Sequence, residues 1–307
     1  MTLQDNDATE ARVQAHFHLS DTELRFFEEN GYVGPFDCIS PEQGEQYAQL
    51  IAREIRNLPL LDFQPWQTGG RLSRLLRRIT RKLSRTAQTA IIVSRKVMGH
   101  TGPTGRGQFW YKSAHFLIPE IGHIGAMRQI VDPMQSILGP DLLLWGAQIV
   151  QKQHVSHRWH SDVEHVAWHG ATAWLGVHNV SRENTMKVFA GSHLFPDTAQ
   201  ELAKRTGANL EDDESILAAL RLTVSDARID SIDIKPGQFF IFAGKTWHAS
   251  YDVSGKLRTA LIFQYCAPSQ RVRIPRNFDP ANIDFDPVQP WVMQVSGEDR
   301  HRINHVR

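Results

Sequence analysis

The hydrophobic pattern of the chain changes abruptly near residue 142. From there on, the sequence contains short runs rich in β-branched and aromatic residues, with turn-forming residues between them. These runs are 142–153, 171–180, 186–189, 229–234, 238–242 and 258–266. Several of them are continuously apolar, which is typical of strands that are covered on both faces. The pattern therefore predicts a β-rich core over about residues 141–270.

Helical signals dominate the chain before this point. Residues 20–23 and 40–43 each have the pattern of a capping box, in which side chains satisfy the first backbone N–H groups of a helix. They predict helices that end at Gly31 and near Asn57, and Pro119–Leu138 predicts one or two more. Helices first and strands afterwards favour an α+β, mainly β fold.

The length of 307 residues allows one large domain, and we predict a single domain with four parts. About residues 1–140 form a mostly helical N-terminal part, and about 141–270 form the β core. Residues 195–228 are an insertion in the core that carries a helix at about Asp213–Leu222. Residues 271–307 form a C-terminal extension.

The net charge of +1 conceals an uneven distribution of charge. Residues 71–85 contain seven basic and no acidic residues, which leaves 27 basic and 33 acidic residues in the rest of the chain. Leucines and an isoleucine at helical spacing predict an amphipathic basic helix. Its cations could form a solvated face, or bind phosphate, a coenzyme A or phosphopantetheine arm, a carrier protein or an anionic membrane surface. Nucleic acid is disfavoured because no aromatic residues are interleaved for base stacking.

Composition excludes several other classes of protein. The chain is 41% hydrophobic and 22% charged, as expected for a globular protein with a core. No apolar run approaches the ~18 residues of a transmembrane helix, and the polar N-terminus lacks the features of a secretory signal. Two cysteines cannot form a disulfide framework. We therefore expect a cytoplasmic protein without integral membrane association.

Three residues could form a metal site. His160 and Asp162 are two positions apart, so on an extended strand both side chains project to one face. Such a pair alone is more often a surface pair than a ligand set. His248 follows the buried-looking run 238–242 and a Gly turn, and could complete a site with two imidazoles and one carboxylate. That set is the facial triad of non-haem Fe(II), which leaves three coordination positions open.

Arg258 supplies a complementary charge ten residues after His248. The open positions suit O2 and a bidentate 2-oxo acid, and a carboxylate at the far end of that acid needs a buried cation. Arginine provides one by bidentate pairing. We expect the strands that carry His248 and Arg258 to pair through residues 251–256, so that both side chains face one cavity.

Several stretches resemble the phytanoyl-CoA dioxygenase family of Fe(II)/2-oxoglutarate-dependent oxygenases. The resemblance covers roughly residues 20–40 and 110–270, and lapses at 59–110 and 195–228. The stretches that carry it are Phe26–Val33, Trp145–Gln148 with Lys152, Trp159–Asp162, Glu183–Thr185, Val188–His193, Lys235–Gln238, His248–Ser250 and Arg258.

The resemblance implies a fold and a set of site residues. The fold would be a double-stranded β-helix, a cupin-like jelly roll, with N-terminal helices packed against it. His160, Asp162 and His248 would bind Fe(II). Arg258, with Ser250 as a second donor, would bind the distal carboxylate of 2-oxoglutarate. Further residues are expected to line the cavity (Gln148, Trp174) or to contact substrate (Lys152, Trp159, Glu164).

The implied reaction converts 2-oxoglutarate and O2 to succinate and CO2 and oxidises a small-molecule substrate, which could carry a phosphate, coenzyme A or a carrier protein. Related chlorinating enzymes have a small residue in place of the iron carboxylate, so Asp162 favours hydroxylation of an unactivated C–H bond over halogenation. Desaturation and ring formation remain alternatives. A non-catalytic jelly-roll binding protein is a rival from another class.

Overall fold

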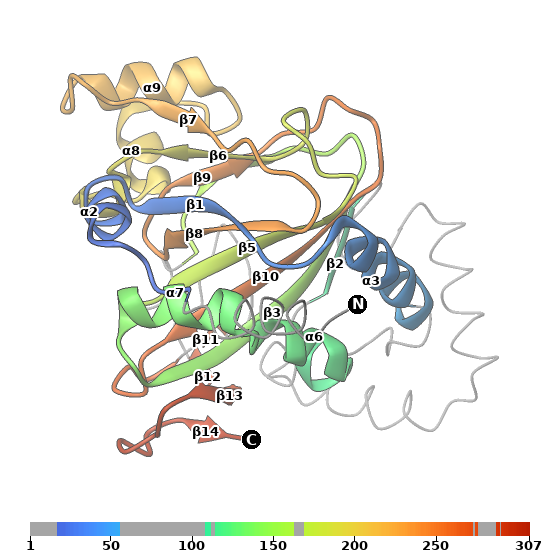
Figure 1. Cartoon of the computed structure of the whole chain (residues 1–307). Helices are drawn as coiled ribbons and strands as arrows, with labels where there is room; N and C mark the ends of the chain where they lie inside the picture. Colours follow the sequence, from blue (N-terminus) through green and yellow to red (C-terminus); the bar gives the residue numbers. More distant parts are fainter. Residues whose placement is uncertain are drawn as a thin grey trace, which may run out of the picture.

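The computed structural model describes residues 17–55, 108–111, 114–162, 169–272, 274–275, 287–288 and 290–307. The predicted basic helix at 71–85 and Glu164 lie outside these residues. Two mainly antiparallel sheets face each other, with helices on the outer side of each (Figure 1). This arrangement confirms the predicted jelly-roll core with packed N-terminal helices.

The larger sheet contains the long strands of the core. Its spatial order is β1 (Tyr32–Asp37), β8 (Gln238–Ala243), β5 (Ala171–His178), β10 (Arg258–Cys266), β3 (Leu142–Lys152), β13 (Trp291–Ser296) and β14 (His305–Val306). The short strand β2 (Gln108–Tyr111) pairs with the other end of β3. The antiparallel register of β3 and β10 places Lys152 opposite Arg258 and Gln148 opposite Ile262.

The smaller sheet contains four short strands. Their spatial order is β4 (His157–His160), β9 (His248–Ser250), β6 (Met186–Phe189) and β7 (Ile229–Ser231). Directly opposed residues in this sheet include His160 and His248, and also His157 and Ser250. A separate pair of strands, β11 (Ile274–Pro275) and β12 (Pro287–Val288), lies in the C-terminal extension.

The first N-terminal helix begins and ends where the sequence predicted, and the second begins where predicted but ends at Glu54, before the expected Asn57. The helix α2 (Asp21–Asn30) starts with the capping box of Ser20 and Glu23, and ends at Gly31, whose φ of 78° is the left-handed conformation that glycine adopts readily. The capping box of Ser40 and Gln43 starts α3 (Pro41–Glu54). The predicted one or two helices before β3 are two, α6 (Pro119–Gly125) and α7 (Arg128–Leu138), preceded by the short η2 (Ala114–Phe116).

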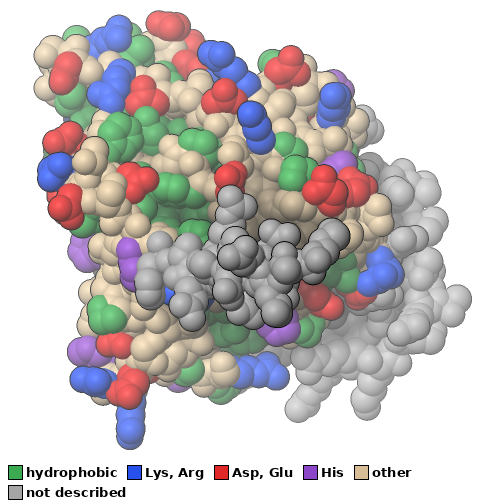
Figure 2. Space-filling model, in the orientation of Figure 1, with side chains coloured by type: hydrophobic (Ala, Val, Ile, Leu, Met, Phe, Trp, Pro, Cys, Tyr) green, Lys and Arg blue, Asp and Glu red, His purple; other side chains and the backbone are tan. Residues whose placement is uncertain are grey.

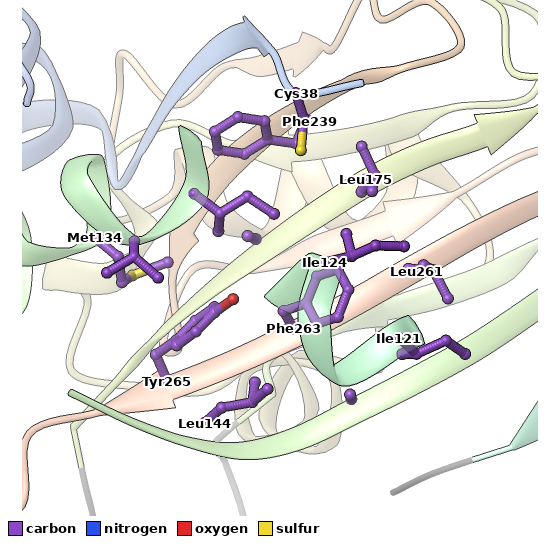
Figure 3. Packing of buried hydrophobic residues seen from close by; sticks show 14 of the residues in the cluster. Cys38, Ile121, Ile124, Met134, Leu144, Leu175, Phe239, Leu261, Phe263 and Tyr265 are labelled. Carbon is purple, nitrogen blue, oxygen red and sulfur yellow. The ribbon is translucent and has the colours of Figure 1, made fainter. Parts of the chain in front are cut away.

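These helices and the outer face of the larger sheet form the main hydrophobic core. Because side chains alternate along a strand, Leu261, Phe263 and Tyr265 of β10 all point toward the helices. Figure 3 shows them packed with Ile124 of α6, and the Tyr265 hydroxyl donates to the Gly125 carbonyl at 2.7 Å. Each fully buried aliphatic or aromatic side chain contributes about 1.5–3 kcal/mol, so this cluster fixes the sheet firmly against the helices.

The insertion differs from the prediction. The expected helix is present as α9 (Asp213–Arg221), but a second helix, α8 (Ala199–Thr206), precedes it. The signals for α8 are a capping box of Thr198 and Glu201 and a left-handed Gly207, which the sequence reading did not use. Both helices lie on the outer face of the smaller sheet (Figure 1), where their apolar residues cover Trp159, Phe189, Trp247 and Ala249.

Two strands lie outside the predicted core. The C-terminal extension contributes β13, which pairs with the Leu142–Leu144 end of β3, and β2 comes from a stretch with no strand signal. In Figure 2, basic side chains are interspersed with acidic ones over the coloured surface. Within the described ranges, no helix has both the length and the apolar character needed to cross a membrane.

Candidate metal and co-substrate site

His160, Asp162 and His248 meet at one point between the two sheets. One donor atom from each lies within 4.8 Å of the others, and the described part of the chain holds no second group of three such side chains. His248 Nε2 is 3.6 Å from Asp162 Oδ1, and the two imidazole centroids are 4.2 Å apart. The register explains the proximity, because β4 and β9 pair directly at His160 and His248. Asp162 lies two residues beyond the end of β4, in a turn.

Backbone carbonyls orient both imidazoles. Nδ1 of His160 is 2.8 Å from the Arg158 carbonyl, and Nδ1 of His248 is 2.9 Å from the Thr246 carbonyl. A carbonyl can only accept, so each Nδ1 carries the hydrogen and each Nε2 keeps its lone pair for a metal. Burial, and secondarily the neighbouring His248, lowers the pKa of His160 well below 6.5. The imidazole is therefore neutral at physiological pH, as a metal ligand must be.

A hydroxyl group orients the carboxylate. Thr172, on the inner face of β5, donates its Oγ1 hydrogen to Asp162 Oδ2 at 2.8 Å. This bond occupies one oxygen and leaves Oδ1 on the side of His248. The donor set of two imidazoles and one carboxylate oxygen fits Fe(II), and it leaves room for further ligands.

Arg258 lies on the opposite sheet at the far end of the same interior. Its side chain is 1% exposed, its guanidinium lies 5.3 Å from the Trp174 ring centroid, and Nη1 donates to the Asn184 carbonyl. Its Nε has no hydrogen-bond partner among the described residues. Burial lowers the pKa of Arg258 to about 10, so it remains charged at neutral pH. An anion is the ligand that this buried, incompletely bonded cation would favour.

The expected pairing of the strands that carry His248 and Arg258 is wrong. β9 pairs with β4 and β6 in the smaller sheet, whereas β10 pairs with β3 and β5 in the larger one. The loop 251–257 crosses from one sheet to the other, so the two side chains face the same space from opposite sides. A line of ring contacts joins them, in the order His248, Phe242, Phe240, Trp174 and Arg258.

Ser250 and Lys152 connect the sheets at the Arg258 end. Lys152 Nζ donates to Ser250 Oγ at 3.0 Å, and both side chains are buried. Lys152 therefore lies beside the residues expected to hold the distal carboxylate of 2-oxoglutarate.

The remaining predicted residues have different surroundings. Trp174 lies on the inner face, and Gln148 is buried where its Nε2 donates to Gln264 Oε1 at 2.7 Å. Trp159 points to the other side of β4 from His160. It is 1% exposed and packs with the insertion helices, and its Nε1 donates to Asp213 Oδ1 at 3.0 Å. This placement does not support a contact between Trp159 and substrate.

Sequence reasoning missed the residues that support the site. Thr172 could have been noticed as a polar residue in an apolar run, two positions before Trp174 and so on the same face. Asn184 acts through its backbone carbonyl, and Gln264 meets Gln148 only through the pairing of β10 with β3. Asn184 lies in the family-like stretch Glu183–Thr185, but no local pattern identifies its carbonyl as a partner of Arg258 or predicts the contact of Gln264 with Gln148.

The fold and this site together define an Fe(II)- and 2-oxoglutarate-dependent oxygenase. The model of the phytanoyl-CoA dioxygenase (PhyH) family matches residues 27–260, more than half of the chain, and the chain therefore belongs to this family. Membership confirms the resemblance seen in the sequence and the expected cofactors, Fe(II), 2-oxoglutarate and O2.

Solved structures with the same fold have low sequence identity to the chain. "CytC3 with Fe(II) and alpha-ketoglutarate" has a TM-score of 0.58 and 18% identity, over 95% of this chain and 94% of that one. The non-heme monooxygenase ThoJ, as a nickel complex, has a TM-score of 0.55 and 17% identity, over 92% and 86%. The epimerase SnoN with Fe3+, alpha ketoglutarate and nogalamycin RO has a TM-score of 0.56 and 13% identity, over 88% and 93%. No curated protein sequence is significantly similar to the chain.

Proposed function

We propose that this oxygenase hydroxylates an unactivated C–H bond of a small-molecule or carrier-linked substrate. The observation that carries the proposal is the convergence of His160, Asp162 and His248 donor atoms within 4.8 Å. In the balanced reaction, 2-oxoglutarate, O2 and substrate give succinate, CO2 and hydroxylated substrate. Bound Fe(II) would supply the activation of O2, with two electrons from the decarboxylation of 2-oxoglutarate.

The three ligand side chains have separate tasks in this proposal. His160 and His248 present Nε2 because their Nδ1 hydrogens are engaged by backbone carbonyls. Asp162 provides the negative charge, and Thr172 holds its second oxygen away from the metal. A carboxylate that binds through one oxygen occupies one coordination position, and three positions are then available for 2-oxoglutarate and O2.

Arg258 binds the distal carboxylate of 2-oxoglutarate, and the Ser250 hydroxyl donates a second hydrogen bond. The Asn184 carbonyl holds Nη1 of Arg258, so the Nε edge is available for the carboxylate. Trp174 lies against the guanidinium, and Gln148 is buried on the neighbouring strand β3. Buried side chains that exclude water lower the local dielectric, and this strengthens the ion pair between Arg258 and the distal carboxylate.

The presence of Asp162 supports hydroxylation over halogenation, because a halide would need the position that this carboxylate fills. Two proteins with the same fold carry out other reactions, since SnoN is an epimerase and SnoK a carbocyclase. Mass spectrometry of the product separates these outcomes. Hydroxylation adds one oxygen atom, desaturation or cyclisation removes two hydrogen atoms, and epimerisation leaves the mass unchanged.

The seven basic residues at 71–85 support a substrate that bears phosphate or a phosphate-linked carrier. Replacing four of the arginines in this segment by Gln would weaken the binding of such a substrate and flatten its salt dependence. Unchanged affinity and an unchanged salt dependence would refute this part of the proposal.

The decisive test is anaerobic titration of the Fe(II)-loaded protein with 2-oxoglutarate. Chelation through the open positions is expected to give an absorbance band at about 500–530 nm. On admission of O2, the protein would then form succinate slowly without substrate and faster with it. His160→Ala would lose both signals. Absence of the band in the folded, iron-loaded protein would refute the assignment of the site.

A further inference from the structure

Lys152 is the one predicted site residue whose position in the structure suggests a new role. We propose that Lys152 is a positioning residue for 2-oxoglutarate, which fixes the Ser250 hydroxyl as a donor and adds a second positive charge beside Arg258. The inference rests on the proposed function, because it concerns the same co-substrate. This role differs from the contact that the sequence led us to expect, between Lys152 and the substrate that is to be oxidised.

The hydrogen bond between Lys152 and Ser250 orients the serine hydroxyl. In its ammonium form, which a bound carboxylate would favour, Lys152 can only donate, so at 3.0 Å its Nζ makes Ser250 Oγ an acceptor. The hydroxyl hydrogen of Ser250 must then point elsewhere and is available to a ligand. Without Lys152, the hydroxyl could rotate and present its lone pairs to a carboxylate, which would repel it.

Two buried basic side chains lie side by side at this end of the interior. Lys152 and Arg258 are directly opposed on β3 and β10, and their side chains are 2% and 1% exposed. Directly opposed residues on one face have Cβ atoms about 4.5–5.5 Å apart. The carboxylate of Asp252 acts on both cations electrostatically, but its oxygens accept from the backbone N–H of His154 at 2.6 Å and from Ser254.

The electrostatic consequence is a site suited to an anion. Burial, and then the charge of Arg258, lowers the pKa of Lys152 from 10.5 to about 7. A carboxylate bound between the two side chains would offset both effects and favour the ammonium form. Two cations and one oriented hydroxyl match the three or four lone pairs that a single terminal carboxylate presents.

The chemical class of co-substrate follows from this arrangement. Lys152 would matter for 2-oxo acids with a distal carboxylate, and not for those with an apolar end. The suitable pair of probes is 2-oxoglutarate and 2-oxopentanoate, which have the same number of carbon atoms and differ in the distal carboxylate. Both can chelate Fe(II) through the 2-oxo acid end.

The experiment measures dissociation constants of both acids for the anaerobic Fe(II) protein and its Lys152→Met variant, by the absorbance band and by calorimetry. Loss of one charge-assisted contact is expected to raise the dissociation constant of 2-oxoglutarate about 10- to 100-fold. The affinity for 2-oxopentanoate is expected to change by less than about 3-fold. A Ser250→Ala background separates the two effects, because the part of the Lys152→Met effect that acts through the hydroxyl should disappear there, whereas the part due to the charge should remain.

Lys187→Met is the matched control. Lys187 is also partly buried and bonded, to Asp213, but it lies on the smaller sheet over the Tyr251 ring. Its loss should change the unfolding temperature without changing the preference between the two acids. If Lys152→Met does not fold, Lys152→Gln, which retains a donor without the charge, tests the charge alone and should weaken the binding of 2-oxoglutarate but not that of 2-oxopentanoate.

The outcomes separate this inference from the proposed function. Equal affinity of wild type and variant for 2-oxoglutarate would overturn the inference, and so would an equal loss for both acids. A wild-type protein that gives no band with 2-oxoglutarate would instead overturn the proposed function.

Discussion

Thr172 offers the sharpest test of how the chain prepares its metal site. The substitution Thr172→Val keeps the shape of the side chain and removes the hydroxyl that donates to Asp162 Oδ2 at 2.8 Å. Thr172 is 2% exposed, so water cannot easily replace the lost donor. The carboxylate would then be free to rotate and to bind the metal through both oxygens.

The magnitude follows from the kind of hydrogen bond. A hydrogen bond to a charged group contributes about 1.5–3 kcal/mol. At about 1.4 kcal/mol for each factor of ten, the variant should bind Fe(II) about 10- to 100-fold more weakly. The same range is typical when a residue that supports a metal ligand is removed.

The assay is anaerobic competition for Fe(II) against a chromophoric chelator. Thr172→Ser keeps the donor and should bind Fe(II) within about 3-fold of wild type. Thr259→Val is the matched control, because Thr259 is equally buried on β10 but its hydroxyl accepts from Gln151 and does not contact Asp162. Its Fe(II) affinity should be unchanged.

Two results would refute the reasoning. One is a Thr172→Val protein with the Fe(II) affinity of wild type, which would mean that the hydroxyl does not orient the ligand. The other is an equal loss of affinity in the Thr259 control, which would mean that the effect comes from general loosening of the sheet.

Four further predictions follow from the same structure. His160→Ala and Asp162→Ala should each abolish succinate formation while the circular dichroism spectrum is retained, and residual turnover above a few per cent in either would argue against the ligand set. Arg258→Gln should raise the KM for 2-oxoglutarate by about 100-fold or more, because the ion pair between Arg258 and the distal carboxylate is lost. The affinity for Fe(II) should be preserved, because this ion pair lies at a distance from the metal site. A fall in kcat alone would contradict this prediction. Asp213→Ala should lower the unfolding free energy in urea by about 1–2 kcal/mol, because the buried Trp159 N–H loses its acceptor. The partly exposed ion pair of Asp213 with Lys187 contributes little to this loss. An unchanged urea midpoint would show that water replaces Asp213 as the acceptor. Burial lowers the pKa of His115 to about 3 in the folded protein. Between about pH 6.5 and pH 3, the His115 imidazole is therefore protonated only in the unfolded chain, and the free energy of unfolding decreases as the pH falls through this range. The loss between pH 7 and pH 5 should be about 2 kcal/mol, and it should persist in His123→Gln but vanish in His115→Phe.

Local physics made much of the fold predictable. Capping boxes and a terminal glycine mark α2 and α3 because they satisfy backbone groups within one helical turn. The same rules would have revealed α8 through Thr198 and Glu201. Strands β5, β8 and β10 are visible because they are apolar on both faces, with helices on one side and the interior on the other.

Other strands were not predictable because their signal is not local. β2 and β13 are strands through hydrogen bonds to opposite ends of β3, and those bonds form between residues far apart in the chain. The pairing expected between β9 and β10 was wrong for a related reason. A short loop between two strands indicates that they are close, but it does not decide whether they share a sheet or face each other across it.

For the site, the chemical types of the residues could be predicted from the sequence alone. Four residue types are enough to predict iron and a 2-oxo acid: an imidazole, a carboxylate two positions later, and a second imidazole and an arginine further along the chain. Three features depended on the tertiary structure: the position of Arg258 across the interior from the three candidate ligands, the contact of Thr172 with Asp162, and the hydrogen bond between Lys152 and Ser250, which are 98 residues apart. The physical reason is that local rules act over a few residues, whereas the order and facing of the sheets determine which distant side chains share a buried interior of low dielectric.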